Sequence, residues 1–369
     1  MFGKLIPIFV ILLLDICLVS AKELLVVTVA TKETDGFRRF MNSAKKYDLP
    51  VLVVGMGEEW DGGDVARFAG GGHKLNLLKD ALAKYADRED LVLLYTDSYD
   101  VVFTNGTTDI MIKYDNFNAR VVFSAEGFCW PDHTLSKEYP TVGATEKRFL
   151  NSGGYIGVAK DIVEILNHRK VDNRDDDQLY FTKIFLDKAL RLKWDIRLDT
   201  KSLIFQNLNG ALGEVMLKFK GDRSFMYNVK TRQVSSLVHG NGPIKPEFNR
   251  IANYLADGWT KSSGCLSCNK NVLSLADTKL PDYPNVMIAI FVESSVPFIE
   301  EFFEKVYRMN YPTSNIDLFI HNSILIFFFS FIFFFPLFSF SLYFLFPFIF
   351  FFPLFSFPFS KRNEFLFSS

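Results

Sequence analysis

The chain has 369 residues and a formal net charge of −1. This length allows two domains, and the near-neutral charge argues against nucleic acid as an obligatory partner. The average composition is misleading, because the two ends of the chain differ in kind from its middle.

The first residues have the features of a secretory signal peptide. Lys4 gives a positive start, residues 5–14 form an apolar core too short to span a bilayer comfortably, and Val19-Ser20-Ala21 is a small-residue cleavage site. We therefore expect cleavage after Ala21 and residence in the endoplasmic reticulum lumen of the secretory pathway. In that compartment the sequence Asn105-Gly106-Thr107 is a glycosylation acceptor.

Cys17 leaves with the predicted signal peptide, so Cys129, Cys265 and Cys268 remain in the mature chain. In an oxidising compartment Cys265 and Cys268 predict a small disulfide loop, because a zinc site would need a second pair of ligands. Cys129 is then left over, and we expect a buried free thiol there.

The mature chain begins with the pattern of a β-α-β unit. The apolar run 24–30 predicts a strand, residues 37–47 an amphipathic helix, and residues 50–55 a second strand. A parallel sheet with a right-handed crossover follows from this order.

A glycine run at 70–72 precedes a helix that we predict over 75–85. Glycines at a helix start let the backbone approach an anion, and Lys74 adds a compensating charge. Glycine-rich surface loops are common, so the position of this run, one element before an acidic pair, is what gives it weight.

The stretch 91–103 carries that acidic pair. Its apolar start, residues 91–94, predicts a strand buried on both faces. Asp97 and Asp100 follow directly, at the end of a strand where open α/β sheets bind ligands. Oxygen ligands of this kind suit Mg²⁺ or Mn²⁺ holding a phosphate, although two aspartates at this spacing also cap ordinary turns.

Two later segments carry candidate sugar-binding groups. Trp130 follows the strand predicted over 121–126, where an aromatic ring stacks on a sugar or anchors a loop. Asp175, Asp176 and Asp177 introduce a helix that we predict to run through Leu190. Acidic residues complement the dipole of a helix start, but three exceed what capping needs, and such carboxylates also accept hydrogen bonds from sugar hydroxyls.

A short strand at 235–239 ends on His239. Single histidines are commonly structural, yet the loop that follows contains Gly242 and Lys245. Together these residues can give a third metal ligand, a close backbone approach and a cation that neutralises phosphate. We predict a closing helix over 251–259.

A second β-α-β start, with strands at 286–292 and 316–321 around a helix at 296–309, cannot bury a core alone, so we expect a domain that has been cut off. Residues 324–359 are almost entirely Phe, Ile, Leu, Ser and Pro, and the prolines interrupt helix formation repeatedly. We interpret this tail as translated non-coding sequence, with a hydrophobic membrane anchor as the alternative. The expected parts are a signal peptide 1–21, a first domain 22–270, a linker 271–283, an accessory unit 284–322 and a non-globular tail 323–369.

Several of these segments together resemble the N-terminal half of the procollagen lysyl hydroxylases, from about Leu24 to Asn322. They read VTVATKETDGFRRF, GGGHK, TDSYDVVF, SAEGFCWPD, NSGGYIG, DDDQLYFT and HGNGP. The resemblance implies an α/β fold of the GT-A glycosyltransferase type, with a mostly parallel central sheet flanked by helices. It also implies Mn²⁺-dependent transfer of glucose or galactose from a UDP-sugar to hydroxylysine or galactosylhydroxylysine of collagen.

The resemblance further implies roles for individual residues. Asp97, Asp100 and His239 would hold Mn²⁺. Thr28, Lys74, Gly242 and Lys245 would bind UDP and its diphosphate. Trp130 would flank the sugar pocket, with Asp175 and Asp176 facing the donor sugar and the acceptor.

The hydroxylase activity of that family needs a C-terminal dioxygenase domain with an Fe(II) and 2-oxoglutarate site, which we do not expect in this chain. The family works as a longer, dimeric chain, so a homodimer is doubtful here, and membrane contact depends on the tail being real protein. A non-catalytic collagen- or partner-binding module with a vestigial nucleotide site is the rival hypothesis. A phosphohydrolase with an aspartate nucleophile fits poorly, because the spacing of Asp97 and Asp100 is wrong for it.

Overall fold

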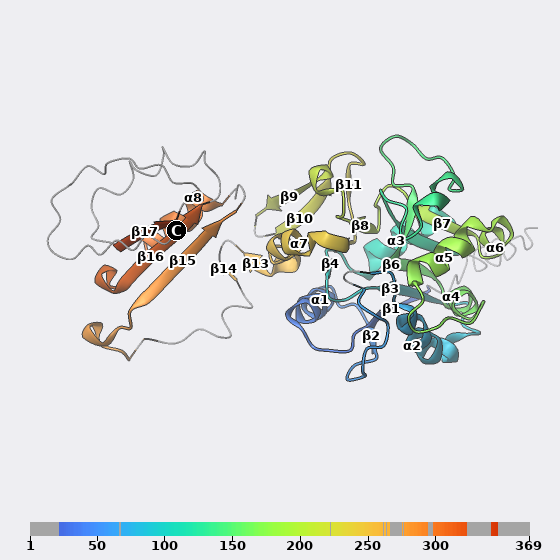
Figure 1. The fold of residues 1–369 in the computed structure, drawn as a ribbon, viewed down its shortest axis with the longest axis horizontal. Helices are drawn as coiled ribbons and strands as arrows, with labels where there is room; N and C mark the ends of the chain where they lie inside the picture. The colour runs from blue at the N-terminus through green and yellow to red at the C-terminus, as the bar shows by residue number, and fades with distance from the viewer. Residues whose placement is uncertain are drawn as a thin grey trace, which may run out of the picture. The chain divides into compact units, whose positions relative to one another are not determined.

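A computed structural model describes residues 22–65, 68–221, 223–260, 262, 264–265, 275, 277–293, 298–322 and 341–345 (Figure 1). The predicted signal peptide, Cys268 and most of the Phe-rich tail lie outside these residues. The chain divides into two compact units between Lys270 and Asn271.

The first unit is built on a six-stranded sheet with the order β2-β1-β3-β6-β5-β7. Strands β1, β2, β3, β5 and β7 run parallel, and β6 alone runs against its neighbours β3 and β5. The expected mostly parallel sheet of an α/β fold is thereby confirmed. The strands are β1 (Glu23–Val29), β2 (Val51–Val54), β3 (Leu91–Thr96), β5 (Val121–Glu126), β6 (Phe149–Val158) and β7 (Ile196–Asp199).

Both faces of this sheet are covered, because alternate side chains of a strand point to opposite faces. In β3, Leu93 and Tyr95 pack with the helices α2 (Gly72–Leu82), α4 (Ala159–Leu166) and α5 (Asp177–Leu186). Val92 and Leu94 pack on the other face with α1 (Asp35–Lys46) and α3 (Thr107–Phe117). Figure 1 shows α1 on one side of the sheet and α2 and α4 on the other.

The boundaries of the helices that carry Lys74 and Asp177 differ from the sequence prediction. Helix α2 begins at Gly72, since Gly71 takes φ +100° at its N-cap, so Lys74 lies inside the first turn. The helix predicted to run through Leu190 ends at Leu186, because Asp187 caps a separate helix, α6 (Lys188–Lys193), by accepting from the N–H groups of Ala189 and Leu190.

A smaller sheet with the order β4-β12-β8 lies at the carboxyl end of β3 and joins β4 (Val101–Phe103), β12 (Leu237–His239) and β8 (Phe205–Asn207). Its middle strand, β12, is antiparallel to β4 and parallel to β8. His239 is therefore opposite Val101 on one side and Asn207 on the other. This register positions the candidate site.

Further along the first unit, Met226 and Phe248 belong to one hydrophobic core cluster with Val102 and Val238 of this small sheet. Strands β9 (Val215–Lys220), β10 (Arg223–Asn228) and β11 (Gln233–Val234) form an antiparallel sheet, and β13 (Trp259–Thr260) pairs with β14 (Gly264–Cys265). The predicted closing helix lies earlier than expected, as α7 (Lys245–Ala252), because Pro246 fits the first turn of a helix. Cys129 is a buried free thiol, as expected.

The second unit contains β15 (Val286–Val292), α8 (Ile299–Tyr307) and β16 (Ile316–Asn322), with the two strands parallel. A third parallel strand, β17 (Ser341–Leu345), comes from the Phe-rich tail and pairs with β16. No sheet was expected in that tail, although aromatic residues such as Tyr343 and Phe344 are common in strands. None of the helices in the described ranges has the length and apolar character that a membrane span requires.

Candidate active site

Two strand ends bring the predicted metal ligands together. Asp97 follows β3 and Asp100 precedes β4, so one tight turn carries both carboxylates. Because β12 pairs with β4 with His239 opposite Val101, the imidazole lies beside Asp100. The N–H of Gly240 donates to the carbonyl of Asp100 at 2.8 Å and extends this pairing.

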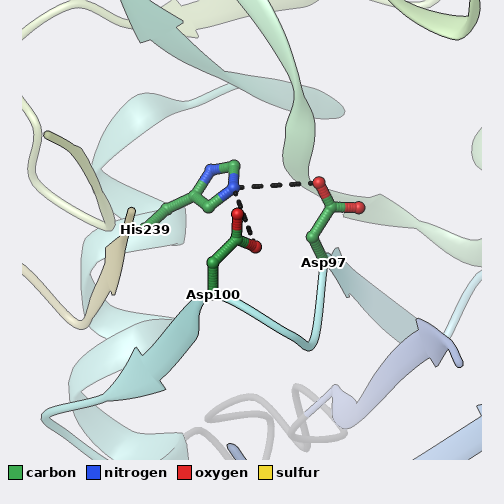
Figure 2. Close-up of side chains that lie close together, drawn as sticks. All are labelled: Asp97, Asp100 and His239. Atoms are coloured by element: carbon green, nitrogen blue, oxygen red, sulfur yellow. Dashed lines mark ion pairs between the residues drawn. The ribbon is translucent and has the colours of Figure 1, made fainter. Parts of the chain in front are cut away.

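The three side chains point toward one another (Figure 2). Nε2 of His239 lies 3.7 Å from Oδ2 of Asp97 and 3.5 Å from Oδ1 of Asp100. Within the described part of the chain, one ligand atom from each residue lies within 4.8 Å of the others. Such spacings suit donors that surround one divalent cation at about 2.1 Å from each.

The charges of the cluster favour ionised carboxylates. Burial alone would raise the pKa of Asp100, but His239 and Lys245 lower it to about 2. Burial also opposes ionisation of Asp97, and Lys74 and His239 outweigh it, so the pKa of Asp97 lies below its usual value. Burial lowers the pKa of His239, but the two carboxylates more than compensate and the net shift is upward. A divalent cation would take over the role of the imidazolium charge, so this donor set fits Mn²⁺ or Mg²⁺.

Asn207 orients the His239 ring from the opposite side. Its Oδ1 lies 3.0 Å from Nδ1 of His239, while its Nδ2 donates to Ser124 Oγ at 2.6 Å and to Ala125 O at 2.9 Å. Because those two oxygens occupy the amide donors, the amide oxygen faces the ring and Nδ1 carries the proton. In the neutral imidazole the lone pair is then on Nε2, the nitrogen that faces the two carboxylates.

Lys74 connects this cluster to helix α5. Its Nζ lies 3.2 Å from Oδ1 of Asp97 and 2.5 Å from Oδ2 of Asp177. Burial lowers the pKa of Lys74, but Asp177 and Asp97 raise it by more, so the ammonium group stays charged. Tyr95 adds a hydrogen bond from its hydroxyl to Oδ1 of Asp97 at 2.8 Å.

A second lysine lies on the other side of the metal-ligand turn. Nζ of Lys245, at the start of α7, is 3.1 Å from Oδ2 of Asp100, and its side chain is half exposed. Gly242 precedes it with φ +69°, and a Cβ there would lie 2.8 Å from Nδ2 of Asn209. A larger residue would therefore displace the loop that carries Lys245.

The predicted acidic cluster separates into different roles. Asp175 is exposed, and its Oδ2 accepts from the N–H of Asp172 at 2.9 Å. Asp176 caps α5 by accepting from the N–H of Leu179 at 2.7 Å, and its other oxygen accepts from Gly70 N–H at 3.1 Å. Both carboxylates are held by nearby backbone groups. Asp177 is the aspartate that pairs with Lys74, which in turn faces Asp97. It was not among the residues predicted for the site.

Trp130 and Thr28, the two remaining residues predicted for the site, differ in their exposure to solvent. Trp130 is 46% exposed in the loop after β5, and its carbonyl accepts from Nε2 of Gln178 at 3.3 Å. Thr28 is fully buried in β1, and its hydroxyl has no hydrogen-bond partner among the described residues. A ring at the surface is available to a sugar, whereas the Thr28 side chain is not accessible in this conformation.

Glu126, at the end of β5, is a buried carboxylate that the sequence analysis missed. Its Oε1 accepts from Asn151 Nδ2 at 3.1 Å and from Gln178 Nε2 at 2.9 Å, and its Oε2 accepts from Asn241 Nδ2 at 2.8 Å. Burial raises the pKa of Glu126 in spite of these donors. A glutamate that ends a mostly apolar strand was the available signal, because ligand sites form at such strand ends.

Comparison with known proteins assigns the family. Residues 20–265, more than half of the chain, match the family model described as the PLOD GT domain. The chain belongs to this PLOD GT domain family. It therefore carries a glycosyltransferase domain, and the resemblance inferred from the sequence motifs is confirmed.

Curated relatives of this PLOD GT domain are longer proteins. The human "Multifunctional procollagen lysine hydroxylase and glycosyltransferase LH3" is 47% identical over 305 residues, which cover 83% of this chain and 41% of the relative. "Procollagen-lysine,2-oxoglutarate 5-dioxygenase 1" of Gallus gallus is 45% identical over 301 residues, which cover 82% of this chain and 41% of the relative. The chain thus spans about two fifths of the length of these relatives.

Two solved glycosyltransferase structures also match. One is involved in glycosylation of the major capsid of PBCV-1, with 12% identity and a TM-score of 0.37 over 63% of this chain and 99% of the other. The second is the apo-form glycosyltransferase GlyE of Streptococcus pneumoniae TIGR4, with 12% identity and a TM-score of 0.30 over 81% of this chain and 75% of the other.

Proposed function

We propose that this domain transfers a hexose from a UDP-sugar to hydroxylysine or galactosylhydroxylysine of collagen in the endoplasmic reticulum lumen. Glucose is the first candidate donor sugar and galactose the second. The observation that carries the proposal is the convergence of Asp97, Asp100 and His239 within 4.8 Å in a chain of the PLOD GT domain family. The collagen-modifying activities in the names of the relatives support the acceptor and the compartment.

In this reaction the bond between the anomeric carbon of the sugar and the β-phosphate oxygen breaks, and UDP leaves with the bonding electrons. The oxygen of the acceptor hydroxyl bonds to the anomeric carbon and its proton is released. A Mn²⁺ ion held by Asp97, Asp100 and His239 would supply the positive charge that stabilises the departing UDP. Lys245, half exposed beside Asp100, is placed to neutralise a phosphate oxygen. Lys74, held between Asp97 and Asp177, keeps a second positive charge fixed at the site.

Residues around this centre are suited to hold the sugar and the nucleotide. Gly242 allows its loop to approach a diphosphate closely, and the exposed ring of Trp130 is free to stack on a sugar face. Asp175, which is exposed, and Asp176 are the carboxylates proposed to face the donor sugar and the acceptor, while the buried Asp177 holds Lys74.

The proposal is tested by measuring UDP release from UDP-glucose and from UDP-galactose with a collagen peptide and Mn²⁺. His239→Ala and Asp97→Ala should abolish release in both cases. His168→Ala is the matched control, because His168 is exposed and packs on Trp194 instead of the candidate site. Full activity of either site variant would refute the metal assignment. A wild-type chain that gives no heat in calorimetry with UDP and Mn²⁺ would favour the non-catalytic binding module.

A further inference from the structure

The two oxygens of the Asp97 carboxylate face different partners. Oδ2 is the oxygen nearest Nε2 of His239, at 3.7 Å. Oδ1 points the other way, where it accepts a hydrogen bond from the Tyr95 hydroxyl at 2.8 Å and faces Nζ of Lys74 at 3.2 Å. One oxygen is thus available to a cation while the other is held by donors.

Holding this carboxylate matters because its neighbour Asp100 carries the same charge. A carboxylate that binds a metal through one oxygen can rotate about its Cβ–Cγ bond, and repulsion between Asp97 and Asp100 favours rotation away from the site. Donors on Oδ1 oppose that rotation. Lys74 is shared with Asp177, to which it lies closer, at 2.5 Å. Of the two contacts to Oδ1 of Asp97, the one from the Tyr95 hydroxyl, at 2.8 Å, is shorter than the one from Lys74, at 3.2 Å.

Tyr95 is itself rigidly placed. It lies near the end of β3, is 1% exposed, and is the register partner of Tyr155 in β6. The two rings stack with centroids 4.7 Å apart and planes 21° apart. Tyr95 and Asp97 are two residues apart at the end of one strand, so their side chains lie on the same face.

We propose that Tyr95 is a positioning residue for the metal centre: its hydroxyl fixes Oδ1 of Asp97 so that Oδ2 is presented to the cation. This inference rests on the proposed function, since it assumes that Asp97 is a metal ligand. Groups that orient a metal ligand in this way typically contribute about 10- to 100-fold to metal affinity.

Tyr155 provides the matched control. It is a tyrosine of the same stacked pair, 2% exposed, and its hydroxyl has no hydrogen-bond partner among the described residues. Tyr95→Phe and Tyr155→Phe therefore each remove one buried hydroxyl and keep the ring stack. Only the first of these substitutions removes a contact to Asp97.

The experiment titrates the mature chain and both variants with Mn²⁺ in the presence of UDP, following binding by calorimetry and by the Mn²⁺ spin-resonance signal. We expect Tyr95→Phe to weaken Mn²⁺ binding about 10- to 100-fold and Tyr155→Phe to leave it unchanged. In the transferase assay Tyr95→Phe should raise the Mn²⁺ concentration for half-maximal rate, with most of kcat restored at saturating Mn²⁺.

Equal Mn²⁺ affinity in wild type and Tyr95→Phe, or equal weakening in both variants, overturns the positioning role. Thermal unfolding in chelator, compared between the two variants, separates loss of fold from loss of binding. A wild-type chain that binds no Mn²⁺ overturns the proposed metal-dependent function itself, and the inference falls with it.

Discussion

Nζ of Lys74 lies 2.5 Å from Oδ2 of Asp177, so a buried lysine in α2 joins the start of α5 to the turn that carries Asp97 and Asp100. The ammonium group also faces Oδ1 of Asp97 at 3.2 Å. The side chains of Lys74 and Asp177 are 13% and 11% exposed, so solvent screens this ion pair little. Among three consecutive aspartates, Asp177 is the one that contacts Lys74.

Asp177→Asn should impair both folding and transfer. It leaves the buried Lys74 with one carboxylate, and breaking a buried pair in this way costs about 3 kcal/mol of unfolding free energy. Asp175→Asn is the control, because Asp175 is exposed and its contact is to a backbone N–H. Urea unfolding and UDP release measure the two effects. A larger loss for Asp175→Asn would contradict this expectation and support the role predicted for Asp175.

Gly153→Ala should weaken metal binding strongly. A Cβ on Gly153 would lie 2.9 Å from Oδ2 of Asp97 and 3.0 Å from Nδ1 of His239, and closer still to Cε1 of the same ring. The imidazole or the carboxylate must therefore move. Gly127→Ala is the control, since nothing lies within 4 Å of a Cβ there. Mn²⁺ titration monitored by calorimetry compares the two, and unchanged affinity in Gly153→Ala contradicts the geometry described here.

Asn207→Ala should lower Mn²⁺ affinity by about 10- to 100-fold, because the His239 ring loses the acceptor that fixes its Nδ1 proton. Asn228→Ala is the control: Asn228 is also buried and its Nδ2 donates to Gln206 Oε1, away from the ring. Both variants should be less stable than wild type in thermal unfolding. Only Asn207→Ala should require more Mn²⁺ for half-maximal activity, and equal Mn²⁺ requirements would show that the amide does not orient the histidine.

Glu126→Gln should change how stability depends on pH. Burial raises the pKa of Glu126 above its ordinary value of 4.5, so the folded state holds this proton more tightly than the unfolded state. The carboxyl group therefore stabilises the fold most below pH 4.5, and that contribution is lost as the pH rises through the raised pKa. The glutamine does not titrate.

We therefore expect the free energy of unfolding of wild type to fall relative to Glu126→Gln as the pH rises across that window. Chemical denaturation in chelator, at a series of pH values from 4 to 8, measures the difference between the two proteins. A constant difference, or one that moves in favour of wild type with rising pH, would show that Glu126 is not held in a desolvated state.

Local patterns were sufficient to predict the central sheet and the acidic pair. A run of apolar residues such as Leu91–Leu94 is buried on both faces wherever it pairs, so a strand in the middle of an α/β sheet could be predicted without knowing its neighbours. Asp97 is the first residue after that strand and Asp100 the fourth. Their closeness is a property of one turn, and it required no knowledge of the tertiary structure.

Two other features were decided by contacts between distant parts of the chain. His239, already expected as a third ligand, lies beside Asp100 because β12 pairs with β4 in one register, and a shift by one residue would turn its side chain to the opposite face. Strand β17 pairs with β16, a pairing that the composition of the tail did not indicate.

Asp175, Asp176 and Asp177 are alike in sequence, but successive residues at a helix start point about 100° apart. Sequence therefore determined which chemical groups are present and which strands carry them. Only the tertiary structure decided which carboxylate faces Lys74, because direction is a property of the packed backbone and not of residue type.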